Sequence, residues 1–150
     1  MAEIQIKKDT TIYHKDTPVR AVGILIEGQV SMKLAHGEII LEAGDGIGFL
    51  DLFQLTHSCD YVAKTDIVVD SYPYRSEESC QQLFDQDPAL APTFIWAALK
   101  QFFHVEELYS LTKYRCNALY TALMEFYRDY TKFSKQYALP TKHLPGLENV

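Results

Sequence analysis

Histidine and cysteine are among the residues of this 150-residue chain that could ligate a metal or act as nucleophiles. The five histidines include no H-x-H pair and the three cysteines form no C-x-x-C motif, so the spacing of neither a zinc site nor a disulfide framework is present. The sequence also has no G-x-S-x-G elbow and no P-loop. We therefore expect no metal, no cofactor and no enzyme activity.

The most informative segment is a turn-rich stretch from residue 41 to residue 63. It contains Gly44-Asp45, Ile47-Gly48, Leu50 and Leu52-Phe53, and then Ser58, Tyr61 and Ala63. This order resembles the phosphate-binding cassette of the cyclic nucleotide-binding domain family, which includes the catabolite activator protein. The family cassette reads G-D-x-(apolar)-G-E-L-x-L-F, followed by R-(S/T)-A-x-V-x-A. Residues 23–30 and 83–90 are similar to flanking parts of the family, so the resemblance spans about residues 10–137.

The resemblance implies a cyclic phosphate site, but this sequence departs from the family at both polar anchors. In the family, N–H groups of a short helix and an arginine hold the phosphate, and a glutamate accepts a hydrogen bond from the ribose 2′-hydroxyl. Phe49 stands at the glutamate position, His57 stands at the arginine position, and Asp51 adds a charge that would repel a phosphate. A lost charge-assisted bond is worth roughly 1.5–3 kcal/mol. Losing the glutamate contact as well weakens binding by about two orders of magnitude or more, so we predict no binding of cyclic AMP in the usual mode.

The same comparison frames a candidate ligand pocket around the cassette. Its residues are Gly44, Gly48, Phe49, Leu50, His57, Ser58 and Cys59. The sequence leaves three alternatives open. They are an empty pocket, a pocket that holds a less charged ligand, and a pocket filled by the Phe49 side chain. The Cys59 side chain is expected to fill a small core position where the family usually has alanine.

Short apolar runs separated by turn residues predict an antiparallel β unit over the first half of the chain. Strands are expected at residues 4–6, 11–13, 21–26, 29–34, 38–41, 60–63 and 67–72. Seven short strands at this spacing favour a β-roll or jelly-roll barrel. The expected fold class is therefore mainly β with α, a cyclic nucleotide-binding-like roll followed by C-terminal helices.

Helix signals begin after residue 73. Ser76 is a candidate N-cap, and Asp87-Pro88 marks a second helix start. Residues 93–139 contain no Gly or Pro, which permits a helix of about 70 Å. We expect either a break near residues 106–113 or a helix that meets a partner. On this helix Trp96, Phe102 and Phe103 are expected to be core residues.

The second half of this helix carries an apolar stripe with the 3-4 spacing of a helix–helix seam. After Cys116 the stripe comprises Leu119, Leu123, Phe126, Tyr130, Phe133 and Tyr137. Either this face packs on the chain's own β unit or it pairs with a second copy across a two-fold axis. We favour a homodimer through this stripe.

Three parts are expected: a β-roll with flanking helices at 1–110, a dimerisation helix at 111–138 and a linker or tail at 139–150. In the catabolite activator family a winged helix-turn-helix follows the long helix, and this chain stops about 70 residues short of one. The chain is therefore either a piece of a longer regulator or a free-standing module.

The net charge and the cysteine content bear on the binding partners and the cellular compartment of the chain. Fourteen Lys and Arg against 20 Asp and Glu give a net charge of −6, which argues against direct DNA binding by this chain. Three cysteines without a framework, no signal peptide and no apolar run long enough to span a bilayer fit a cytoplasmic protein with no membrane contact.

These observations favour a non-catalytic regulatory domain resembling the effector domains of bacterial transcription regulators. One alternative is a genuine sensor of a cyclic nucleotide or another small ligand with an altered anion site. The other is a ligand-free dimerisation module. We expect any movement of the cassette to reach the long helix through the face formed by Leu50, Leu52 and Phe53.

Overall fold

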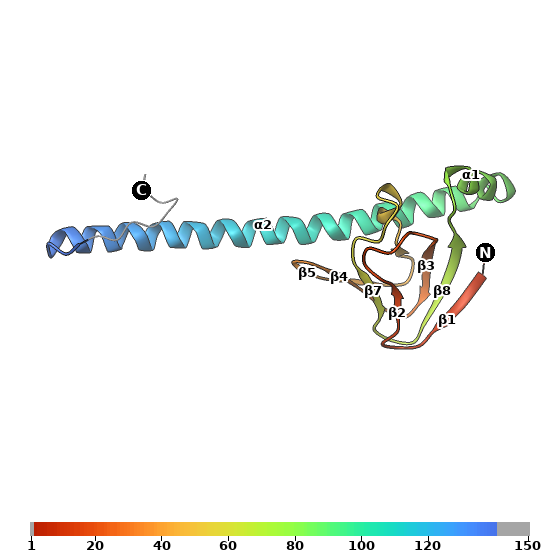
Figure 1. Ribbon diagram of the computed structural model, residues 1–150, viewed down its shortest axis with the longest axis horizontal. Coiled ribbons are helices and arrows are strands. Elements are labelled where there is room, and N and C mark those ends of the chain that lie inside the picture. The colour runs from red at the N-terminus through yellow and green to blue at the C-terminus, as the bar shows by residue number, and fades with distance from the viewer. Residues whose placement is uncertain (1, 141–150) are drawn as a thin grey trace. The chain divides into compact units, whose positions relative to one another are not determined.

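The structure is a computed structural model that describes residues 2–140. The elements in chain order are β1 (Ala2–Ile6), β2 (Thr11–Tyr13), β3 (Ala21–Glu27), β4 (Val30–Leu34), β5 (Gly37–Leu41), β6 (Gly46–Ile47), the 3-10 helix η1 (Leu50–Phe53), β7 (Asp60–Ala63), β8 (Ile67–Pro73), α1 (Glu77–Gln86) and α2 (Leu90–Gln136). Figure 1 shows these elements along the chain.

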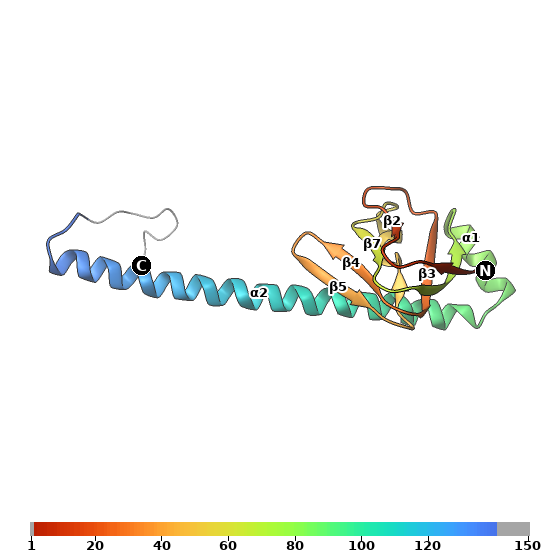
Figure 2. The ribbon, with the colours of Figure 1, turned by 90° about the horizontal axis from the view of Figure 1, so that it is seen from below.

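The strands form two four-stranded sheets in which every neighbouring pair is antiparallel. Their orders are β1-β8-β3-β6 and β2-β7-β4-β5, and Figure 2 shows the strands from a second side. This arrangement confirms the predicted fold class, and each of the seven expected strands is present within one or two residues at either end. Sequence analysis missed β6, because two residues are too short to show an alternating pattern.

The inward side chains of the strands form two apolar clusters. The first lies between the sheets and includes Leu25, Met32, Leu41 and Tyr61, all 2% exposed or less. Val105 and Leu108 of α2 pack against it. The second combines Val22 and Tyr72 of β3 and β8 with Phe49, Phe94 and Ala97. The first turns of α2 are therefore part of the core of the roll.

The helix signals in the sequence are confirmed at α1. The Ser76 side chain accepts a hydrogen bond from the Ser79 backbone, and the Ser79 side chain accepts one from the Ser76 backbone. This reciprocal capping box satisfies N–H groups at the start of α1. Helix α2 then runs without a break through the region where one was considered.

The chain divides into two compact units, one ending at Leu108 and the other beginning at Tyr109. Residues 90–108 of α2 belong to the first unit and contribute to the candidate site described below. The predicted linker or tail at 139–150 lies outside the described residues from position 141 onward. None of the helices within residues 2–140 is long and apolar enough to cross a membrane.

The expectation that Trp96, Phe102 and Phe103 are core residues is wrong. Their side chains are 60%, 51% and 56% exposed. The face of α2 that packs on the roll instead carries Phe94, Ala97 and Gln101, which are buried. A helix packs one face on a sheet, and the sequence alone does not say which of two apolar faces that is.

Candidate functional site

Two glycines shape the cassette between β6 and η1. A Cβ atom at Gly46 would lie 2.7 Å from Cδ2 of Phe49 and 3.1 Å from the Ala97 carbonyl oxygen. Glycine therefore permits the close approach of the α2 backbone to β6. Gly48 has a φ of +80°, and a Cβ atom there would contact His57 and Tyr13 at 3.4 Å.

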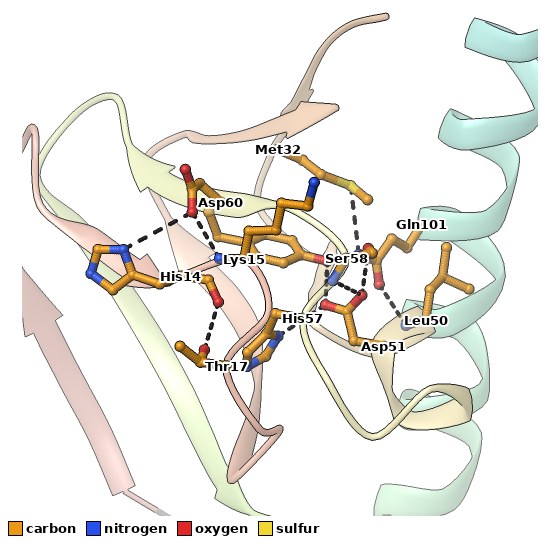
Figure 3. A network of polar contacts seen from close by, with 11 residues as sticks. His14, Lys15, Thr17, Met32, Leu50, Asp51, His57, Ser58, Asp60 and Gln101 are labelled. Carbon is orange, nitrogen blue, oxygen red and sulfur yellow. Dashed lines mark hydrogen bonds and ion pairs between the residues drawn. The ribbon is translucent and has the colours of Figure 1, made fainter. Parts of the chain in front are cut away.

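The Asp51 carboxylate is the centre of the cassette. Asp51 is 1% exposed, and its carboxylate accepts four hydrogen bonds. Oδ1 accepts from the backbone N–H of Ser58 at 3.0 Å and from the Ser58 hydroxyl at 2.6 Å. Oδ2 accepts from Nδ1 of His57 at 2.9 Å and from the Tyr61 hydroxyl at 3.0 Å. Figure 3 shows the Asp51 side chain lying beside His57 and Ser58. Four bonds replace the water that a buried carboxylate has lost.

The network continues from the cassette to α2 through Gln101. Nε2 of this fully buried side chain donates to the Tyr61 hydroxyl at 2.9 Å, and Oε1 accepts from the Leu50 backbone N–H at 3.2 Å. Figure 3 shows Gln101 reaching from α2 toward Leu50 and Asp51. One glutamine therefore links η1, β7 and α2.

The amide groups at the start of η1 already have partners. The N–H of Leu50 donates to Gln101, that of Asp51 to the Gly48 carbonyl at 3.2 Å, and that of Leu52 to the Phe49 carbonyl at 3.3 Å. These groups are therefore committed within the chain.

His57 is held from two sides. Its ring stacks on Tyr13 with 4.4 Å between ring centroids and 7° between planes, while Nδ1 bonds to Asp51. The ring is 2% exposed. Stacking on Tyr13 fixes the plane of the imidazole, in which Nδ1 faces the Asp51 carboxylate.

A second link joins the cassette to α2 through Asp45, which is 2% exposed. Its carboxylate forms an ion pair with Nζ of Lys100 at 2.8 Å and lies 3.2 Å from Nε2 of His104. It also accepts from the Glu42 backbone N–H at 2.7 Å. Because Lys100 and His104 are four residues apart, one face of α2 presents both to Asp45.

The three residues of the expected route from the cassette to α2 lie in different surroundings. Leu50 contacts Gln101 through its backbone N–H, and Leu52 packs on the second apolar cluster. Phe53 is 87% exposed and takes no part in that cluster.

The structure places the residues of the candidate pocket in different surroundings. Gly48, His57 and Ser58 gather around Asp51 and Tyr13. Phe49 is buried in the second cluster, with its ring 5.1 Å from that of Phe94. Its side chain thus packs toward α2 among apolar residues, and the side chain against His57 and Ser58 is Asp51.

Gly44 lies beside Lys100, because a Cβ atom built on Gly44 would be 3.3 Å from Nζ of Lys100. The Cys59 side chain is 1% exposed in the first cluster, as expected for a core position. Burial, and after it the charge of Asp51, raises the pKa of the Cys59 thiol to about 11. At neutral pH this thiol is protonated and is a poor nucleophile.

Burial also raises the pKa of both tyrosines at the site. The pKa of Tyr13 is raised to about 12, and that of Tyr61 is raised further because the Asp51 charge adds to its burial. Both hydroxyls are therefore neutral, and Tyr61 is a hydrogen-bond donor to the carboxylate.

Within residues 2–140 no group of three or more His, Cys, Asp or Glu side chains could hold a metal ion.

Sequence reasoning missed Tyr13, Tyr61 and Gln101 as site residues and assigned Asp51 only a repulsive role. A signal was present in α2, because Gln101 interrupts an apolar spacing formed by Ala97, Val105 and Leu108. A glutamine on a buried helix face needs hydrogen-bond partners across the core.

Comparison with known proteins supports the fold through structure alone. No protein-family model matches the chain, and no curated protein matches it. The c-di-GMP-responsive global regulator CLP of Xanthomonas campestris has a similar structure, with a TM-score of 0.60 and 18% identity over 89% of this chain and 66% of CLP.

Two further solved structures are similar. The catabolite activator protein of Thermus thermophilus gives a TM-score of 0.54 at 16% identity over 75% of this chain and 55% of that one. The N-terminal domain of a transcriptional regulator from Streptomyces coelicolor gives 0.50 at 18% identity over 71% and 77%. This chain thus spans about half of the Thermus protein. These likenesses, together with the two sheets and the C-terminal helix, show that the chain has the cyclic nucleotide-binding domain fold.

Proposed function

From this fold, we propose that the chain is a non-catalytic regulatory domain of a transcription regulator that does not bind cyclic AMP or cyclic GMP in the usual mode. The observation that carries the proposal is the set of four hydrogen bonds accepted by Asp51. Two of the donor residues, His57 and Ser58, stand where the family cassette has its arginine and its serine or threonine. A carboxylate already occupies the donors that a cyclic phosphate would need.

The electrostatics oppose a phosphate for a second reason. The incoming anion would have to displace Asp51 from a position that water barely reaches, and two negative charges at one buried site repel strongly. His57 offers single N–H groups in place of the two-pronged arginine contact. On the ribose side, Phe49 offers an aromatic ring and no acceptor for a hydroxyl group.

The regulatory role is supported by the similar proteins and by the links from the cassette to α2. CLP is a global regulator, and the Streptomyces domain comes from a transcriptional regulator. Gln101 and Asp45 give any rearrangement of the cassette a direct contact with α2. The buried, protonated Cys59 thiol and the engaged Ser58 hydroxyl offer no nucleophile, which supports the non-catalytic part of the proposal.

Pairing of two copies along α2 is the second part of the proposal. Every seventh residue from Ile95 to Tyr137 is apolar or aromatic. This column consists of Ile95, Phe102, Tyr109, Cys116, Leu123, Tyr130 and Tyr137. It includes three members of the seam expected from the sequence, Leu123, Tyr130 and Tyr137. The other three members, Leu119, Phe126 and Phe133, each lie four residues before one of these. A seven-residue repeat is typical of two helices that pair along their length.

A second copy of this chain is the partner that the column fits. Ile95, Phe102, Tyr109 and Leu123 are between 46% and 66% exposed. Helix α1 has ten residues and is too short to cover such a column. If each side chain buries on the order of 100 Å², two copies bury about 1,400 Å², the area of a stable interface.

Isothermal titration calorimetry tests the ligand part of the proposal. We expect no heat of binding when the chain is titrated with cyclic AMP or cyclic GMP at micromolar concentrations, while an established cyclic AMP receptor titrated in parallel gives the usual signal. Micromolar binding of either nucleotide would overturn the proposal. Loss of that heat in His57→Ala would then identify a true sensor with an altered anion site.

A further inference from the structure

The hydrogen-bond donors around Asp51 are arranged by parts of the chain other than Asp51 itself. The His57 ring is fixed by its stacking on Tyr13, and the Tyr61 hydroxyl is held by Gln101. The Ser58 N–H belongs to the backbone that leads into β7. If the carboxylate were removed, these groups would remain close to their present positions and would lack an acceptor.

The donors also match the shape of one kind of anion. Two donors converge on Oδ1 and two others on Oδ2, at distances between 2.6 and 3.0 Å. A planar group with two equivalent oxygens satisfies all four at once, as a carboxylate does. The geometry is that of a binding site for a small monocarboxylate.

We propose that Asp51 is a tethered anion that fills a carboxylate-binding site within its own chain, so that a free monocarboxylate binds there when the Asp51 side chain is shortened. This inference deepens the proposed function and rests on it, since it names what keeps the cassette closed to external anions. A tethered group acts at a high effective concentration and loses little freedom on binding. External anions therefore do not compete with Asp51 in the wild-type chain.

The site is within reach of solvent. Asp51 and His57 are buried, but Ser58 is an exposed residue at the edge of the site. An anion the size of formate thus has a short path to the Ser58 N–H and hydroxyl. The Asp51→Ala variant removes the carboxylate group and leaves a space of about formate size, whereas Asp51→Gly leaves room for acetate.

Thermal unfolding with added anions tests the inference. We expect sodium formate to raise the melting temperature of Asp51→Ala by about 2–4 °C relative to sodium chloride at the same ionic strength. Acetate should do so for Asp51→Gly. The wild-type chain and Asp51→Asn, whose side chain fills the space, should respond equally to formate and chloride. If Asp51→Ala is unfolded without formate, recovery of its far-ultraviolet circular dichroism on adding formate is the corresponding result.

The amide resonance of Ser58 in a ¹H–¹⁵N spectrum locates the effect. Formate should shift this resonance in Asp51→Ala. The double variant Asp51→Ala/Ser58→Pro lacks both the N–H and the hydroxyl at position 58, so formate should not raise the melting temperature of the double variant. Equal stabilisation by formate and chloride, or failure of Asp51→Ala to fold at any formate concentration, would overturn the inference. Cyclic nucleotide binding by the wild-type chain would instead overturn the proposed function and leave the formate result unaffected.

Discussion

Asp51 shows how hydrogen bonds from within one chain can satisfy a buried carboxylate. Each carboxylate oxygen accepts two bonds, and three of the four come from side chains. Leaving one such group unsatisfied in the interior costs more than the net worth of the bond it made. Removing a single donor atom should therefore lower the free energy of unfolding by more than the net contribution of the hydrogen bond it made.

The Tyr61→Phe substitution tests this at one atom. It removes the donor to Asp51 and the acceptor for Gln101 without changing the packing volume. We expect the free energy of unfolding to fall by about 1–3 kcal/mol, measured by urea denaturation. Tyr74→Phe is the matched control, because Tyr74 is partly buried in the second cluster, and it should change stability by less than about 0.5 kcal/mol. Equal effects of the two changes would contradict the role assigned to Tyr61.

The Cys59 thiol gives the stability of the roll a pH dependence above neutrality. Its pKa is raised from 9.0 to about 11 in the folded chain, by burial first and then by the Asp51 charge. Between these values the unfolded chain loses the proton while the folded chain keeps it. The stabilising contribution is complete below pH 9 and is lost as the pH rises toward 11.

We therefore expect the free energy of unfolding of the wild-type chain to fall between pH 9 and pH 11, with about 2 kcal/mol of the fall due to Cys59. Denaturation curves of Cys59→Ala over the same range should show a shallower fall. Other groups whose pKa values are raised by burial, among them Tyr13, Tyr61 and Tyr72, add to the fall. Parallel curves for the two proteins would show that the thiol has no such role.

At the scale of elements, the positions of the strands along the chain were predictable because turns and alternating apolar residues are local signals. The cassette motif also placed η1 and β7 correctly. The orientation of α2 was not predictable, since Phe94 and Ala97 face the roll while Trp96 and Phe102 do not. Both sets are apolar, and only packing against β3 and β8 distinguishes them.

The site was predictable only in part for a related reason. The resemblance to the family cassette identified His57 and Ser58 as positions that face an anion, and in the structure both contact the Asp51 carboxylate. That the anion is the chain's own Asp51 depends on a side-chain rotamer and on Gln101, which is 50 residues away in the sequence. Local patterns carry no information on such distant partners.

The ion pair between α2 and the β5–β6 turn should stabilise the attachment of the helix. Lys100→Met removes the cation beside the buried Asp45 carboxylate, and we expect a loss of about 1–3 kcal/mol in urea denaturation. Lys7→Met is the matched control, because the Lys7–Asp66 pair also spans 2.8 Å but is exposed on both sides. Exposed pairs of this kind contribute little to stability, because solvent and salt screen them. A larger loss in Lys7→Met would contradict this assignment.

At the scale of the whole molecule, the proposed pairing of two copies follows from the heptad column of α2. A charge placed in the column would be buried without a partner in the pair. We expect sedimentation velocity to show dimers for the wild-type chain and monomers for Leu123→Glu and Phe102→Glu. The control is Arg128→Glu, an equally exposed change of charge five residues after Leu123 and away from the seam. A monomeric wild-type chain would contradict the pairing.

Identifying by crystallography which group contacts His57 and Ser58 in the wild-type chain is the most direct test of the central claim. In a crystal structure of the wild-type chain grown with excess cyclic AMP, we expect the Asp51 carboxylate to lie within hydrogen-bond distance of the Ser58 N–H, the Ser58 hydroxyl and His57, with no nucleotide between them. Density for a cyclic phosphodiester bonded to His57 and Ser58, with Asp51 displaced, would contradict it.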